Sequence, residues 1–134
     1  MDDEPDTAGR NVIAWFEIPV RRVADAINFY QNVFGFSIVQ QSLNRRVYGV
    51  VTGGLTYPND KYGVFVEYLP HEPLPCSSIH YFTACSQPEF DRIISNVALQ
   101  RGGIVSLGLS HPLFNTSYAI CTDNQGTQFG VVLN

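Results

Sequence analysis

The feature of this sequence that most constrains its fold is an order of predicted elements that occurs twice, with an offset of about 64 residues. Each copy reads as a strand, a helix and three further strands. This period is too long for a solenoid unit and suits a duplicated half-domain. One helix covers only one face of a small sheet, so neither copy can bury its apolar residues alone. We therefore predict an α+β fold in which two βαβββ modules form an open cleft lined by their sheets.

The first module is predicted at about residues 12–70. The segment Val12–Val20 has the composition of a strand. Apolar residues at helical spacing follow from Val23 to Phe34, and Gly35 supplies the residue that helices prefer just past their end. Three more strands are predicted at Phe36–Gln41, Val47–Val51 and Gly63–Leu69.

The second module is predicted at about residues 78–134, after a proline-rich connector. A strand at Ser78–Cys85 leads into a helix at Pro88–Leu99, which begins at a proline and which we expect Gly102-Gly103 to stop. Three strands complete the module, at Ile104–Leu107, Ser117–Thr122 and Thr127–Leu133.

The first ten residues differ in composition from the rest of the chain. They are polar and contain four acids, so residues 1–10 are predicted to be a disordered tail and residues 11–134 a single domain. Across the whole chain 45% of residues are hydrophobic and only 15% are charged, which is typical of a folded protein. No cluster of Lys and Arg is present to bind a phosphate backbone, so nucleic acid is not an expected partner.

Two further patterns bear on where the protein works. No apolar run approaches the roughly 18 residues that a membrane span requires, so no membrane partner is expected. The three cysteines, Cys76, Cys85 and Cys121, have no C-x-x-C spacing and are expected to be reduced. These patterns favour a cytoplasmic protein.

Short motifs in both modules carry a resemblance to a known family. The segment Trp15–Phe36 reads W-F-E-I-P-V, then A-I-N-F-Y-Q-N-V-F-G-F, and the second module contains Gly102-Gly103-Ile104-Val105 and Asp123-Asn124-Gln125-Gly126-Thr127. In this order and spacing, the motifs resemble the vicinal oxygen chelate superfamily, which includes glyoxalases, bleomycin-resistance proteins and dioxygenases. The resemblance implies the two-module fold and, from related folds, a homodimer.

The resemblance also implies where a metal would bind, because metal-dependent members take one ligand from the first and last strand of each module. These positions fall on Trp15, Glu67, His80 (or the residue before it) and Gly130. Tryptophan and glycine have no side-chain lone pair for a metal. Two ligands leave too much of the coordination sphere to water for tight binding, so we expect no metal cofactor, with a divalent ion as the alternative. Similar departures mark a branch described as relatives of lactoylglutathione lyase.

Three titratable residues are candidates for chemistry in the cleft. Glu17 shares its strand parity with Trp15 and Pro19, while Glu67 is at a position that the family directs into the cleft. Either glutamate is a candidate general base, and the alternative for each is a carboxylate paired within the fold. His80 either faces the cleft, where it meets Glu67, or shares the parity of Phe82 and is a core histidine.

Four aromatic side chains are candidates to bind a flat ligand on the cleft walls, although ordinary core packing is the alternative for each. They are Trp15, Tyr81, Phe114 and Tyr118.

These observations predict a cleft protein that binds a small polar organic molecule without a tightly bound metal and that has a potential proton-transfer activity. One alternative is a metal-dependent lyase or isomerase of glyoxalase type. The other is a protein that sequesters a small molecule and does no chemistry. Whether the chain is an enzyme stays open at this point.

Overall fold

The computed structural model describes residues 16–53, 63–75, 79–108, 110 and 115–133. The predicted tail at residues 1–10 lies outside this part, as do the candidate residues Trp15 and Phe114. The first module contains β1 (Phe16–Val20), α1 (Val23–Phe34), β2 (Ser37–Leu43), β3 (Arg46–Gly53) and β4 (Gly63–Glu67). The second contains β5 (His80–Ala84), α2 (Gln87–Leu99), β6 (Gly103–Gly108), β7 (Tyr118–Thr122) and β8 (Gln128–Leu133).

Each module forms its own four-stranded sheet. The strand orders are β1-β4-β3-β2 and β5-β8-β7-β6, and in each sheet the first strand of the module pairs in parallel with the last. The other neighbours are antiparallel. β1 starts at residue 16 and β5 at residue 80, while α1 and α2 start at 23 and 87, so the offset is 64 residues at both elements. The predicted α+β fold of two βαβββ modules is confirmed.

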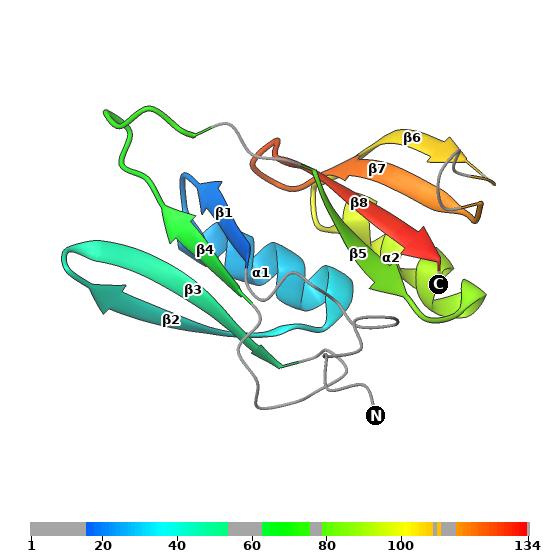
Figure 1. Ribbon diagram of the computed structural model, residues 1–134, viewed down its shortest axis with the longest axis horizontal. Coiled ribbons are helices and arrows are strands. Elements are labelled where there is room, and N and C mark those ends of the chain that lie inside the picture. Colours follow the sequence, from blue (N-terminus) through cyan, green and yellow to red (C-terminus); the bar gives the residue numbers. More distant parts are fainter. Residues whose placement is uncertain (1–15, 54–62, 76–78, 109, 111–114, 134) are drawn as a thin grey trace, which may run out of the picture.

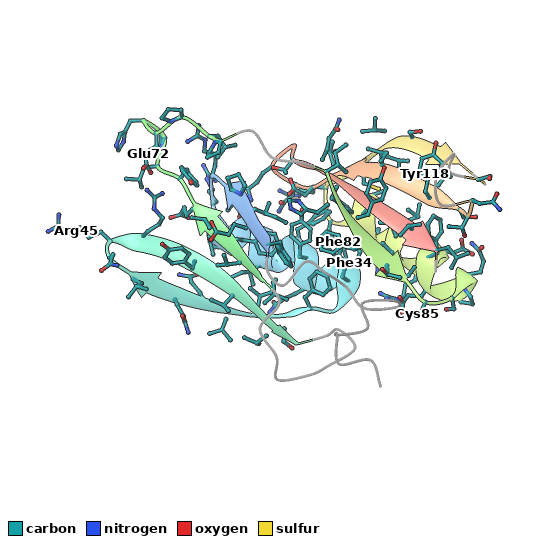
Figure 2. All side chains as sticks on the ribbon, in the orientation of Figure 1. Phe34, Arg45, Glu72, Phe82, Cys85 and Tyr118 are labelled. Carbon is teal, nitrogen blue, oxygen red and sulfur yellow. The ribbon has the colours of Figure 1, made fainter. Side chains whose placement is uncertain are left out.

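The two modules share one apolar core. In Figure 1 the sheets lie side by side, with α1 and α2 behind them. The ring of Tyr30 on α1 stacks on Phe65 of its own sheet at 4.6 Å and contacts Phe129 of the other sheet at 5.8 Å, measured between ring centroids. Phe34 meets Phe82 across the same boundary at 4.9 Å (Figure 2). Because both helices and both sheets contribute to this cluster, the core is continuous between the modules.

The faces of each sheet have different environments. We call the face that packs on the helices the helix face and the opposite one the distal face. Alternation along β1 places Ile18 and Val20 on the helix face and Glu17 and Pro19 on the distal face. The distal face of the first sheet carries a small second cluster of buried valines, Val50, Val64 and Val66.

The ends of both helices are set by local sequence. Gly35 follows α1 in the left-handed conformation, with φ of +78°, as predicted. At the end of α2 the residue in the left-handed conformation is Arg101, with φ of +70°, and its N–H donates to the carbonyl of Ala98. Gly102 is needed for a different reason, since a Cβ there would lie 2.4 Å from the carbonyl oxygen of Thr122. The prediction that Gly102-Gly103 ends the helix is therefore corrected, because the left-handed turn comes one residue earlier.

Replacing Arg101 by glycine is expected to stabilise the protein by about 1 kcal/mol, because a residue with a Cβ is strained at its φ of +70°. The free energy of unfolding in urea measures this gain. Gln100→Gly is the matched control, since Gln100 has a φ of −96° and glycine relieves no strain there. An equal loss of stability in Arg101→Gly and Gln100→Gly would contradict the assignment of backbone strain to Arg101.

Candidate functional site

A pocket of about 350 Å³ lies where the two modules and their connector meet. Its described lining comes from three parts of the chain: β1, the connector with the residue before β5, and the turn from β7 to β8 with the first residue of β8. The lining residues are Pro19, Leu74, Pro75, Ile79, Gln125, Gly126, Thr127 and Gln128. None of these described side chains is ionisable at physiological pH. The volume is at the lower end of the range for small-molecule sites.

The turn that forms one wall, residues 123–127, is organised by a buried acid. Asp123 is 2% exposed, and its carboxylate accepts the backbone N–H groups of Gln125 (2.9 Å) and Thr127 (3.0 Å). It also accepts the hydroxyl hydrogen of Tyr30 on α1 at 2.8 Å. Burial raises the pKa of Asp123 above its ordinary value although these hydrogen bonds oppose the shift. Burial and the Asp123 charge likewise raise the pKa of Tyr30. We call residues 123–127 the docking turn.

Gln125 fixes the docking turn to the first module. Its Oε1 accepts the backbone N–H groups of Arg21 (3.1 Å) and Arg22 (2.8 Å), between β1 and α1. Its Nε2 donates to the carbonyl of Arg22 at 3.0 Å. Asn124 adds a bond from its Nδ2 to the carbonyl of Asp25 at 2.9 Å. The pocket wall and the junction between the modules are therefore the same structure.

The connector, residues 69–75, is fastened by two arginines. The Arg46 guanidinium pairs with both carboxylate oxygens of Glu72, at 3.1 and 2.7 Å, and lies 4.6 Å from the centroid of the Tyr68 ring. Arg21 donates to the carbonyls of Leu69 and Glu72. The hydrogen bond from Arg46 and that from the Leu69 backbone lower the pKa of Glu72 to about 2. These contacts position Leu74 and Pro75 at the pocket.

Glu67, the carboxylate expected in the cleft, lies on the helix face. It is the β4 partner of Val20, and it shares its parity with Phe65 of the core. One of its oxygens accepts the backbone N–H of Val23 at 2.9 Å, at the first residue of α1. A carboxylate at a helix N-terminus binds a donor that the helix leaves unpaired. The expectation that Glu67 points into the cleft is therefore corrected.

His80 also lies on the helix face, because the 64-residue offset makes it the counterpart of Phe16. Its ring centroid is 5.9 Å from that of Phe16, and burial lowers the pKa of the imidazole. Within the described chain no hydrogen bond joins it to Glu67. The core alternative is the one that the strand parity supports, and Ile79, one residue earlier, lines the pocket instead.

Glu17 is the candidate acid that lies on the same side as the pocket. It is exposed on the distal face of β1, two residues before the pocket residue Pro19. Two residues of a strand span about 6.6 Å.

The aromatic candidates of the second sheet lie over glycines on its distal face. A Cβ at Gly130 would be 2.4 Å from the Tyr81 ring, and one at Gly108 equally close to the Tyr118 ring. Figure 2 shows Tyr118 on the second sheet. Neither tyrosine belongs to the described pocket lining. Each ring therefore fills the space that a side chain in place of the glycine would occupy.

The four positions at which the resemblance implies metal ligands do not form a metal site. Glu67 and His80 lie on the helix face, whereas Gly130 lies on the distal face under the Tyr81 ring. Trp15 lies outside the described residues. In the part of the chain that the structure describes, no three His, Cys, Asp or Glu side chains gather as a metal site would require. We assign no metal-dependent step to these residues.

The sequence did not point to most of the pocket residues. The motif Asp123-Asn124-Gln125-Gly126 predicted a turn, and the prolines near residue 73 predicted a connector. No local pattern indicated that these segments meet, because they contact through the packing of one module on the other.

No described helix is long and apolar enough to cross a membrane.

Comparisons with known proteins bear on the fold and the family of the chain. Residues 12–131 match the model of the Glyoxalase/Bleomycin resistance protein/Dioxygenase superfamily. No curated protein sequence matches the chain.

Several solved structures share the fold. A glyoxylase/bleomycin resistance protein/dioxygenase domain from Frankia is similar with a TM-score of 0.72 and 11% identity, over 92% of this chain and 98% of that one. A family enzyme from Burkholderia phytofirmans has a TM-score of 0.67 and 14% identity, over 90% and 97%. Glyoxalase I from Zea mays has a TM-score of 0.66 and 12% identity, over 89% of this chain and 44% of that one. With a family match that covers most of its length, the chain belongs to the Glyoxalase/Bleomycin resistance protein/Dioxygenase superfamily.

Proposed function

We propose that this protein binds an uncharged small organic molecule in the pocket between its modules and that it does so without a metal ion. The observation that carries this proposal is the described pocket lining, which combines prolines and aliphatic side chains with two carboxamides and a hydroxyl. Apolar walls with a few placed polar groups are typical of small-molecule sites. A charged ligand would lose its hydration without gaining an opposite charge from these residues.

The docking turn and connector suit this role because both are held in place before any ligand arrives. Asp123 and Gln125 hold the docking turn, while Arg46 and Arg21 hold the connector. A site that is ordered in advance loses less entropy on binding. A site that is ordered in advance is sufficient for a protein that sequesters a ligand.

Ile79 provides the test of the pocket. It is 41% exposed, so Ile79→Arg is expected to fold while placing a charged group against the apolar wall. Binding of uncharged ring compounds, measured by ligand-observed NMR, is expected to fall at least about tenfold, equivalent to about 1.4 kcal/mol.

The matched control is Ile104→Arg, because Ile104 is also 41% exposed and lies on β6 away from the pocket. It is expected to bind as the wild type does. Glu17→Gln extends the experiment to proton transfer. If a ligand that the wild type turns over is bound equally well by this variant but no longer turned over, Glu17 is assigned as the base. Equal binding by the Ile79 and Ile104 variants would overturn the proposal.

A further inference from the structure

The polar groups around the pocket are not equally available to a ligand. Three backbone N–H groups of the docking turn are used internally, because Gln125 and Thr127 donate to the Asp123 carboxylate and Gly126 donates to its carbonyl. The carboxamide of Gln125 is used at both ends, since its Oε1 accepts from Arg21 and Arg22 and its Nε2 donates to Arg22.

Two polar side-chain groups of the described lining remain, the Thr127 hydroxyl and the Gln128 carboxamide. No hydrogen bond within the described chain engages either of them. Gln128 is the first residue of β8, has an exposed side chain, and shares its parity with Gly130 on the distal face. Its backbone position is fixed by pairing with Thr122 of β7. A carboxamide offers one donor group and one acceptor side by side.

We propose that Gln128 determines the ligand specificity of the pocket by pairing with a neutral donor–acceptor edge, such as that of a carboxamide, lactam or urea. This inference rests on the proposed function, because it needs a ligand in the pocket. Pro19, Leu74 and Ile79 would contact the apolar part of the ligand, while Gln128 at the exposed side of the pocket pairs with its polar edge.

The chemistry selects against carboxylates. A carboxylate accepts hydrogen bonds only, so it can use the Nε2 donor of Gln128 but leaves Oε1 facing another oxygen. No described lining residue supplies a positive charge to compensate. The guanidinium of Arg21, which follows β1, is already bonded to the carbonyls of Leu69 and Glu72.

The test compares three probes of similar ring size, benzamide, benzoate and toluene, by chemical-shift titration of the whole protein. The wild type is expected to bind benzamide at least about tenfold more tightly than benzoate. Gln128→Leu keeps the approximate size but removes both polar atoms. It is expected to lose about tenfold for benzamide, the size of one hydrogen bond of about 1.4 kcal/mol, and nothing for toluene.

Gln41→Leu is the matched control, because Gln41 is an exposed glutamine on strand β2 and does not line the pocket. It is expected to bind all three probes as the wild type does. If benzamide and toluene bind the wild type and Gln128→Leu with unchanged affinities, the specificity role of Gln128 is wrong while the binding function stands. If none of the probes shifts the pocket resonances of the wild type, both proposals fail.

Discussion

Asp123→Ala is expected to lower the free energy of unfolding by about 3 to 5 kcal/mol, because it removes one acceptor that serves a buried donor and two part-buried ones. The backbone N–H groups of Gln125 and Thr127 and the hydroxyl of Tyr30 all donate to this carboxylate. Each donor left without a partner costs about 1 to 3 kcal/mol. Because the docking turn forms a pocket wall, the variant is also expected to lose binding of uncharged probes.

Urea denaturation measures the loss, and Asp91→Ala is its control. Asp91 is an exposed residue of α2 whose carboxylate accepts from Gln87 at the surface, so its removal is expected to cost about 0.5 kcal/mol or less. Similar stability of the two alanine variants would mean that Asp123 does not hold the docking turn.

The Asp123 carboxyl also makes the stability of the protein depend on pH. Burial raises the pKa of Asp123 in the folded state above the ordinary value of 3.8, which applies to the unfolded chain. At a pH between the unfolded and the folded pKa, the folded state therefore binds more protons than the unfolded state. Its contribution therefore favours folding at low pH and is lost as the pH rises through this window. Asp123→Asn removes the titration, so the wild type is expected to gain stability relative to this variant as the pH falls towards 3.8. A constant difference across pH would contradict the raised pKa.

Phe129→Ala is expected to cost about 3 to 5 kcal/mol, since it removes a large side chain from the centre of the core. Phe129 is 1% exposed on β8. Its ring contacts rings of both modules, Phe29, Tyr30 and Phe34 on α1 and Phe82 on β5. A cavity at this point therefore weakens the packing of one module on the other as well as that of the second sheet.

The shape of the transition is part of the expected result. Because the core is continuous, Phe129→Ala is expected to unfold in one step with the same dependence on urea as the wild type. Leu99→Ala is the control, since Leu99 is 74% exposed at the end of α2 and its truncation leaves no cavity. Two separate transitions in Phe129→Ala would show that the modules unfold independently.

Local sequence patterns were sufficient to predict the order of the elements and their repetition. Apolar periodicity located both helices, and Gly35 marked the end of α1 correctly because a left-handed residue is a local requirement. The offset of 64 residues follows from the same local patterns. The fold class could therefore be predicted, because secondary structure and its duplication are properties of neighbouring residues.

Which side chains share a site depends on how the strands and the two modules pack. Successive residues of a strand point to opposite faces, so an uncertainty of one residue in the position of β5 left the face of His80 open. The position of Glu67 was read from a family motif, whereas its oxygen accepts the N–H of Val23 at the start of α1.

The pocket could not be predicted because its walls come from segments that are far apart in sequence. Gln125 contacts Arg22 from 103 residues away, and Asp123 contacts Tyr30 from 93 residues away. Such contacts exist only after the apolar faces of the two modules have packed together, since a buried acid is stable only where its donors are already in place. The sequence determined the two modules, and their packing on each other created the pocket.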